Sequence, residues 1–345
     1  MSEAIVRNLD RRSLVLSLLG AAGYGCSSNG SSNGRNATSV RLALPLNPVF
    51  YLPAYLAREL GYFKSEGLSV EIQDLPGGSK NVQAMLGGSA DVIGAVYEHT
   101  LWLAADNRAT RCFVLFIDRP GLMLVVSPQA EQTLRTVADL KGRNVGVATP
   151  GSQSHFFVNY ILKRNGLASE DISAVGIGMG SAAVAAIERG KVDAAAVTGS
   201  AIAVLQRRHP NLRILANGCT KEGVKELFGL ESYPTHGLLA PDNWLDRNPI
   251  TAGKLVKAVQ QANRWVREHS PEQILEKIPA EYRMEDAAAD IDAIRMTIPM
   301  LSVDGRIKRE SAEAVRRVLS SSIEKVRAAK FDITSTYTNQ FLQDA

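Results

Sequence analysis

Short runs of consecutive apolar residues alternate along the chain with longer stretches in which apolar positions recur every three or four residues. The runs are typical of strands covered on both faces of a parallel sheet, and the wider spacing is typical of helices. The pattern predicts strands at 42–44, 70–72, 92–96, 144–148, 174–177 and 194–197, with helices ending near Leu60, Gly88, Arg164 and Gly190. It therefore predicts an α/β protein with two βαβαβ units, each a mostly parallel sheet flanked by helices.

The two units share a sequence repeat. Residues 78–92 align with residues 180–194 without a gap, at an offset of 102 (193 minus 91). Identical residues stand at the matched positions Ser79 and Ser181, Val82 and Val184, Ala84 and Ala186, Gly88 and Gly190, and Asp91 and Asp193. We expect the two serines to cap their helices and the two glycines to end them.

Beyond residue 235 the spacing is helical, and it predicts helices over 252–269, 271–278, 286–301 and 311–329. We expect the chain to cross between two lobes near 119–122 and again near 233–236. The predicted organisation is a first lobe at 40–121, a second lobe at 122–234, and a return to the first lobe at 235–345, where the C-terminal helices pack mainly on the first lobe.

The N-terminal segment has the composition of an export signal. Arg7, Arg11 and Arg12 precede a short apolar stretch over 14–22 that is followed by small residues. Residues 1–26 are predicted to be a signal peptide of the general secretory type, with the twin-arginine route as the alternative. Cys26 stands where a lipoprotein carries its acylated cysteine, and residues 27–39, rich in Ser, Asn and Gly, form a flexible linker. The alternative to lipidation is cleavage nearby and a free protein outside the cytoplasm.

Composition narrows the function further. The 345 residues are 45% hydrophobic and 21% charged, and the net charge of +4 is spread evenly, which argues against a nucleic-acid surface. The three cysteines are too few and too scattered for a disulfide framework. The five histidines match no metal motif, and the loops at 45–51 and 149–154 match no dinucleotide or phosphate fingerprint. We therefore expect no metal and no cofactor.

The candidate ligand site is a cleft where the carboxyl ends of the two sheets face each other. Helix N-termini at such a cleft offer free N–H groups and partial positive charge to an anion. The residues expected there are Asn47, Phe50, Tyr51, Ser79, Tyr97, Glu98, His99, Ser152, Gln153, Ser154, His155, Ser181, Thr198 and Ser200. Two alternatives are that Phe50 packs in the core and that Ser152 or Ser154 caps its helix. Glu98 could face away, pair with Arg119, or bind a basic nitrogen of the ligand.

Several motifs resemble those of one family. They are the stretches 61–71, 87–91 and 136–145, with Asp332 and residues 337–341 near the C-terminus. Together they resemble the periplasmic substrate-binding proteins of ABC importers, in the branch that binds sulfonates, taurine, nitrate and the thiamine-precursor pyrimidine. The resemblance implies a type II two-lobed fold, a monomer without enzymatic activity, and delivery of a small-molecule ligand to an ABC permease and its ATPase. It also matches loop 151–155 to the family's anion-contacting loop.

Two other functions remain open at this stage. A pyrimidine synthase of thiamine biosynthesis has the same fold, but that enzyme type is cytosolic and carries a cysteine-rich cluster. A periplasmic sensor that reports ligand occupancy to a membrane kinase uses the fold as well.

The signal assignment predicts that the mature protein begins at or near Cys26 and lies outside the cytoplasm. If Cys26 is lipidated, Cys26→Ser abolishes membrane association in cell fractionation, because the acyl chains are the only anchor expected. Unchanged association in this variant would contradict lipidation, and full-length protein in the cytosol would contradict export.

Overall fold

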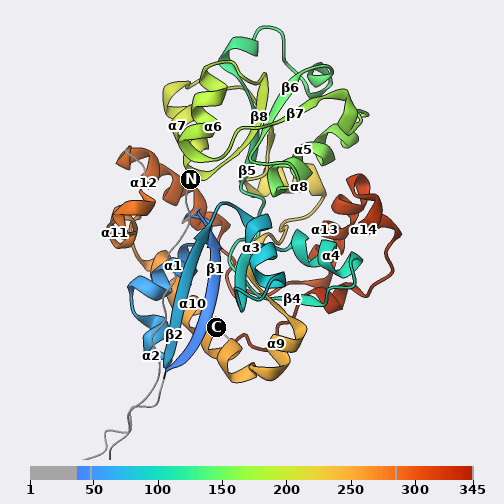
Figure 1. Ribbon diagram of the computed structural model, residues 1–345. Coiled ribbons are helices and arrows are strands. Elements are labelled where there is room, and N and C mark those ends of the chain that lie inside the picture. The colour runs from blue at the N-terminus through green and yellow to red at the C-terminus, as the bar shows by residue number, and fades with distance from the viewer. Residues whose placement is uncertain (1–36, 47–48, 284–285, 344–345) are drawn as a thin grey trace, which may run out of the picture. The chain divides into compact units, whose positions relative to one another are not determined.

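The computed structural model describes residues 37–46, 49–283 and 286–343, and two five-stranded mixed sheets form its framework (Figure 1). The first sheet has the order β2-β1-β3-β10-β4, with β1 (Thr38–Pro45), β2 (Leu68–Leu75), β3 (Val92–Val96), β4 (Thr110–Leu115) and β10 (His236–Pro241). The second has the order β7-β6-β8-β5-β9, with β5 (Leu122–Val126), β6 (Asn144–Val147), β7 (Ser173–Gly176), β8 (Ala194–Thr198) and β9 (Ile214–Asn217). The predicted signal peptide, Cys26 and most of the linker lie outside the described residues.

Each sheet contains one antiparallel strand, which the two predicted βαβαβ units lack. In the first sheet β10 runs antiparallel to β3 and β4, and in the second β5 runs antiparallel to β8 and β9. Both strands begin directly after the chain has passed from the other sheet, so no helical crossover turns them parallel. The remaining strand pairs, such as β1 with β2 and β6 with β7, are parallel as predicted.

The strand β1 begins within the predicted linker. Thr38 and Ser39 pair in register with Leu68 and Ser69 of β2, so the linker cannot extend to residue 39. Both side chains are exposed, and the polar composition that favoured a linker here is therefore compatible with a strand end.

Helices follow most of the predicted positions. In the part of the chain before β10 they are α1 (Leu52–Glu59), α2 (Tyr62–Ser65), α3 (Gly78–Leu86), α4 (Glu98–Ala105), α5 (Gln153–Arg164), α6 (Gly180–Glu188), α7 (Gly199–Arg208) and α8 (Lys221–Phe228). After β10 they are α9 (Asp242–Arg247), α10 (Pro249–Glu268), α11 (Pro271–Lys277), α12 (Ala287–Thr297), α13 (Arg309–Ser322) and α14 (Glu324–Ala328). The helix predicted over 311–329 is two helices, because Ile323 has an extended backbone (φ −117°, ψ 100°). None of the helices within the described ranges is long and apolar enough to cross a membrane.

The repeated glycines end their helices as predicted, but the repeated serines do not cap theirs. Gly88 and Gly190 follow α3 and α6 with φ of 74° and 66°, the left-handed conformation that glycine adopts without strain. The N-cap positions belong instead to Gly77 and Met179, so Ser79 and Ser181 lie in the first helical turn.

The repeated aspartates brace equivalent points of the two sheets. Asp91 accepts from the backbone N–H of Arg41 in the middle of β1 and pairs with its guanidinium at 2.6 Å. At the same offset of 102, Asp193 pairs with Arg143 at 3.2 Å and accepts from the N–H of Asn144 in β6. Each carboxylate thus fixes the turn before one strand to the backbone of the neighbouring strand.

The C-terminal helices pack mainly on the first lobe, and two of them also contact helices of the second lobe. The helix α10 packs on α1 and α2, but α12 packs on α7 and α13 on both α4 and α5. Arg207 of α7 pairs with Asp292 of α12 at 3.4 Å, and Lys163 of α5 donates to the Ser321 carbonyl of α13. The apolar face of α13 is wide enough to serve two partners, with Val315, Val318 and Leu319 buried.

The brace predicts that Asp91→Ala and Asp193→Ala each lower the free energy of unfolding by about 1–3 kcal/mol, because each removes a charge-assisted bond to a backbone N–H. The ion pairs add little, since both arginines are partly exposed. Urea unfolding measures the change, with Asp246→Ala as the control, because Asp246 is exposed and Arg111 keeps its bond to Asp242. Equal effects at Asp91 and Asp246 would contradict the brace.

Candidate functional site

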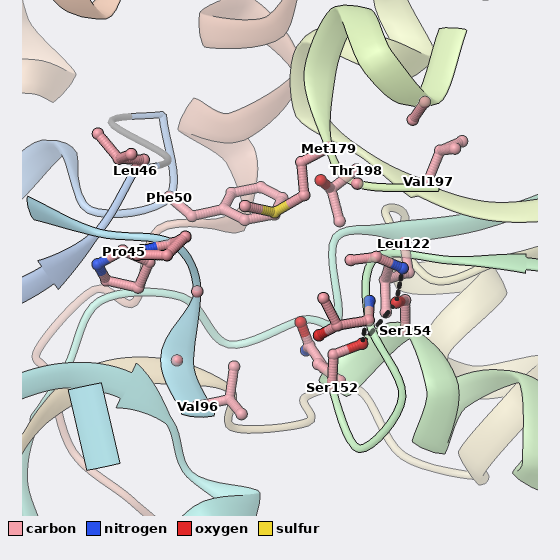
Figure 2. A pocket seen from close by; sticks show the side chains of 18 of the residues that line it. Pro45, Leu46, Phe50, Val96, Leu122, Ser152, Ser154, Met179, Val197 and Thr198 are labelled. Atoms are coloured by element: carbon pink, nitrogen blue, oxygen red, sulfur yellow. Dashed lines mark hydrogen bonds between the residues drawn. The ribbon is translucent and has the colours of Figure 1, made fainter. Parts of the chain in front are cut away.

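A cavity of about 300 Å³ lies between the two sheets (Figure 2). Residues at the strand ends of both sheets, and in the loops and helix starts beside them, line it. They are Pro45, Leu46, Phe50, Tyr51, Pro76, Gly77, Gly78, Ser79, Val96, His99 and His236 from the first sheet and its connections, and Leu122, Ala148, Thr149, Ser152, Gln153, Ser154, Gly178, Met179, Gly180, Ala183, Ala196, Val197, Thr198 and Ala201 from the second. This volume is at the lower end of the range for small-molecule sites.

Four helices begin at this cavity, and none of them has a side-chain cap. The N-cap residues of α3, α5, α6 and α7 are Gly77, Ser152, Met179 and Thr198, all of which line the cavity. None of the four side chains accepts a hydrogen bond from a backbone N–H of its helix. The N–H groups at the first positions of these helices, such as those of Gln153 and Ser154 in α5, are therefore available to a ligand, together with the partial positive charge of each helix end.

The serine loop before α5 keeps one hydroxyl hydrogen free. Ser154 Oγ accepts from the Ala148 N–H at 2.9 Å, and Ser152 Oγ accepts from the Thr149 N–H at 3.4 Å. The two hydroxyls contact each other at 2.9 Å, so one donates to the other. The two hydroxyls carry two hydrogens, and the second remains for a bound group.

Apolar side chains lie across the cavity from these hydroxyl and N–H donors. Phe50 from the first sheet and Met179 from the second point toward each other across the cavity in Figure 2. Phe50 is fully buried, so both alternatives hold for it: it belongs to the core and lines the cavity. It also packs against Gly121 in the first crossing, where φ is 66° and a Cβ would lie 2.5 Å from Phe50 Cζ.

The lining described above contains no Asp, Glu, Lys or Arg. Its two titratable imidazoles are neutral, because burial lowers the pKa of His99 to about 4 and that of His236 to about 3. The second value is lowered further by the nearby His99. In this cavity the ligand therefore meets dipoles and apolar surface instead of a formal charge.

The structure brings eight of the predicted site residues to the cavity: Phe50, Tyr51, Ser79, His99, Ser152, Gln153, Ser154 and Thr198. Asn47 and the side chain of Ser200 lie outside the described residues. Four others lie elsewhere, for reasons given below.

Tyr97 is turned into the first lobe, where its hydroxyl bonds with Thr336. The counterpart of Thr198 at the offset of 102 is Val96, and it is Val96 that lines the cavity. Ser181 is exposed, because Gly180 takes the place at the helix start that faces the cavity. His155 is folded back on its own loop, since its Nδ1 accepts from the Gly151 N–H at 3.0 Å.

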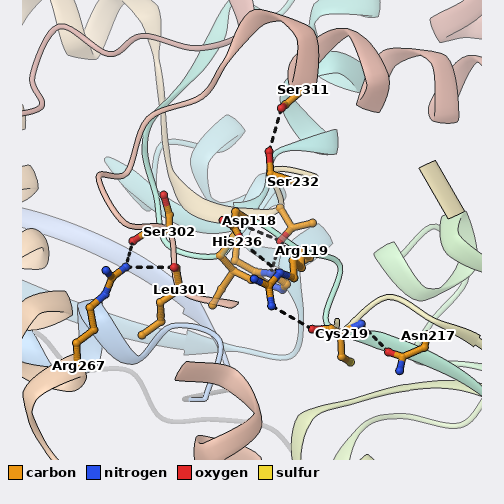
Figure 3. Close-up of polar contacts among 12 residues, drawn as sticks. Asp118, Arg119, Asn217, Cys219, Ser232, His236, Arg267, Leu301, Ser302 and Ser311 are labelled. Atoms are coloured by element: carbon orange, nitrogen blue, oxygen red, sulfur yellow. Dashed lines mark hydrogen bonds and ion pairs between the residues drawn. The ribbon is translucent and has the colours of Figure 1, made fainter. Parts of the chain in front are cut away.

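Glu98 is buried behind the cavity. It lines a void of about 10 Å³, also bounded by Gln153 and Tyr233, and its Oε2 has no hydrogen-bond partner among the described residues. Burial raises the pKa of Glu98 to about 8, with the Tyr233 hydroxyl opposing the shift. It does not pair with Arg119, which contacts Asp118 at 3.7 Å and the Cys219 carbonyl at 3.5 Å (Figure 3).

Sequence reasoning missed His236, Met179 and Leu46. Met179 could have been found from the repeat, because it stands at the offset of 102 from Gly77 and both precede a cavity helix. His236 carried no comparable signal, since it begins an antiparallel strand that the pattern did not predict. No cluster of His, Cys, Asp or Glu in the described part of the chain could hold a metal ion.

Comparisons with known proteins place this geometry in context. A family model described as NMT1/THI5 like matches residues 49–274. The chain is 26% identical over 262 residues to YtlA of Bacillus subtilis (strain 168), which carries the name of a binding protein, with 74% of this chain and 73% of YtlA covered. It is also 26% identical over 227 residues to the 4-amino-5-hydroxymethyl-2-methylpyrimidine phosphate synthase THI13 of Saccharomyces cerevisiae (strain ATCC 204508 / S288c), covering 63% of each chain.

Solved structures are similar over most of the chain. One from Bordetella bronchiseptica RB50 is 35% identical with a TM-score of 0.82, covering 88% of this chain and 95% of that one. The alkanesulfonate-binding protein SsuA from Xanthomonas axonopodis pv. citri, bound to MOPS, has a TM-score of 0.66 at 20% identity, covering 88% and 98%. A Candida albicans protein described as having the generic periplasmic binding protein fold has a TM-score of 0.67 at 14% identity, covering 89% and 98%. The fold is therefore that of the periplasmic binding proteins.

The raised pKa of Glu98 predicts a pH-dependent loss of stability. Its folded-state pKa of about 8 lies above the ordinary value of 4.5, so the folded state holds the proton more tightly and loses stability as the pH rises from about 4.5 to 8. Glu98→Gln removes this term. Relative to the parent, the variant should gain about 2–4 kcal/mol of unfolding free energy between pH 4.5 and pH 8.5.

Urea unfolding at the two pH values measures the gain at Glu98, and the exposed Glu231→Gln is the matched control. A parent and a Glu98→Gln variant whose stabilities run parallel over this range would show that Glu98 ionises freely in the folded protein.

Proposed function

The chain belongs to the NMT1/THI5-like family, and from this membership and its cavity we propose that it is an extracytoplasmic solute-binding protein of an ABC importer. It captures a small organic ligand between its two lobes and delivers it to a membrane permease driven by an ATPase. The predicted signal peptide supports a location in the periplasm or cell envelope, and we expect a monomer without metal or cofactor.

The observation that carries the proposal is the set of four uncapped helix N-termini at one uncharged cavity. Each such end favours a negative charge by about 0.3–1 kcal/mol at the surface, and by more in a partly buried site. No lysine or arginine among the lining residues above would hold the anion after it has bound. This arrangement suits a receptor that must release its ligand.

The ligand we propose has one anionic or strongly electronegative group and an apolar or planar remainder. Its polar end meets Ser152, Ser154 and the starts of α5, α6 and α7, and its body contacts Phe50 and Met179. These apolar contacts would contribute nothing to a bare inorganic ion. Sulfonates and carboxylates of modest size fit this description, as does the MOPS bound by the Xanthomonas relative.

The yeast relatives support a second candidate, an enzyme of pyrimidine synthesis. Their similarity covers 63% of this chain at 26% identity, and their name applies to them alone. The two candidates differ in what happens to a bound molecule. A ligand that the purified protein returns chemically unchanged supports the receptor, and a converted one supports the enzyme. A sensor would likewise return it unchanged, and differs by lacking a cognate permease.

A thermal-unfolding screen against sulfonates, carboxylates, nitrate and pyrimidines tests the proposal directly. A ligand present at about 100 times its Kd adds about 2.7 kcal/mol of stability. If no member of these classes stabilises the protein, the proposed ligand chemistry is wrong.

The anion site predicts that Ser152→Asp weakens binding of an anionic probe from this screen more than tenfold. Aspartate at the N-cap of α5 occupies its free N–H groups and repels the incoming charge. Ser152→Asn is the matched control, because asparagine caps equally well without a charge. Calorimetry compares the two, and equal affinities would place the anion elsewhere.

A further inference from the structure

Two buried histidines form part of the first-sheet wall of the cavity. His99, at the start of α4, is 3% exposed, and His236, at the start of β10, is 4% exposed. Both line the cavity, and Phe50 packs on the His236 ring with 4.6 Å between ring centroids. Neither has a carboxylate partner in the described part of the chain, so a buried salt bridge does not account for the two histidines.

Hydrogen bonds around Thr235 fix the tautomer of His236. The Thr235 hydroxyl has one hydrogen, and it donates to the Arg119 carbonyl at 2.7 Å or to the Ile117 carbonyl at 3.1 Å. Its oxygen must therefore act as the acceptor in its 3.1 Å contact with His236 Nδ1. Nδ1 carries the proton, and Nε2 is left as an acceptor that bonds to no described residue.

His99 has unmet hydrogen-bonding capacity at both ring nitrogens. Neither Nδ1 nor Nε2 makes a well-aligned hydrogen bond to a described residue, although the side chain is almost fully buried. The Val96 carbonyl lies near the ring and opposes the lowering of its pKa, so it can engage at most the protonated nitrogen. Its ring lies against the start of α3, where a Cβ on Gly78 would be 3.2 Å from His99 Cε1. A neutral imidazole has one donor and one acceptor, and leaving a buried polar group unpaired costs about 1–3 kcal/mol.

The rest of the cavity supplies many donors, whereas its hydroxyls, such as that of Thr198, can either donate or accept. The starts of α5, α6 and α7 present N–H groups from the second sheet, and α3 adds its own beside His99. The two histidines differ from these groups, because the unprotonated nitrogen of a neutral imidazole can only accept. The uncharged lining and the positive helix ends disfavour a cationic ammonium as their partner.

We infer that this site selects ligands that carry a neutral hydroxyl or amide N–H opposite their anionic end, and that His236 and His99 recognise that group. The inference rests on the proposed function and narrows its ligand class. When the ligand's apolar part fills the cavity and excludes water, the acceptor nitrogens of His236 and His99 have no other partner among the described residues. A donor on the ligand then satisfies them. A site built in this way rejects analogues that lack the group, because binding such an analogue leaves buried acceptors without partners.

Matched probe pairs test this inference by calorimetry: 4-hydroxybenzoate with benzoate, and 3-hydroxypropanesulfonate with propanesulfonate. In the parent protein, the hydroxylated member of at least one pair should bind at least tenfold more tightly. His236→Phe should reduce that ratio to below about threefold, and His99→Leu should reduce it as well. His236→Gln keeps a side-chain acceptor and should restore part of the ratio.

His269→Phe is the matched control, because His269 stacks on Trp265 outside the cavity lining and should keep the parental ratio. Thermal unfolding of each variant without probe verifies folding. If both members of each pair bind the parent equally, the inference is overturned and the proposed function stands. A preference for 4-(aminomethyl)benzoate over 4-hydroxybenzoate also overturns it, since the preferred donor would be cationic. If no probe binds at all, the proposed ligand chemistry and the inference fall together.

Discussion

The site depends on backbone N–H groups that the chain leaves without partners at the starts of α3, α5, α6 and α7. In a parallel strand–helix connection, a helix begins where the preceding strand ends, so strand ends that face each other bring helix starts together. A capping side chain would stabilise each helix by about 1 kcal/mol. The four helices forgo that contribution, and the donors remain available to a ligand between the sheets.

Much of the fold could be predicted because the same strand–helix pattern occurs twice in the chain. The strands β3 and β8 and the ends of α3, α5 and α6 were found from apolar runs, left-handed glycines and the offset of 102. The strands β4, β5, β9 and β10 were not predicted, although β5 is an apolar run over residues 122–126. The antiparallel direction of β5 and β10 could not be predicted, because it depends on where the chain has come from and not on local composition. The same limit applies to α12 and α13, whose apolar faces do not specify which lobe they contact.

The candidate site was predicted in part, and the errors have local causes. Residues in loops and first helical turns, such as Ser152 and Ser79, reach the cavity because several adjacent positions face it. At the end of β3, however, neighbouring side chains point to opposite faces, so an error of one position placed Tyr97 where Val96 stands. His236 could not be assigned without knowing that β10 pairs with β3.

Gly121 joins the cavity wall to the segment that connects the sheets. Its backbone leaves no room for a side chain against Phe50, and Phe50 in turn faces Met179 of the other sheet. The backbone torsion angles at Gly121 and the position of the Phe50 ring are therefore coupled. A ligand wide enough to displace the ring would therefore also strain the backbone of the first crossing at Gly121. Ligands of equal charge but different width should thus favour different angles between the lobes, and a permease that recognises one angle would transport only some of the molecules that bind.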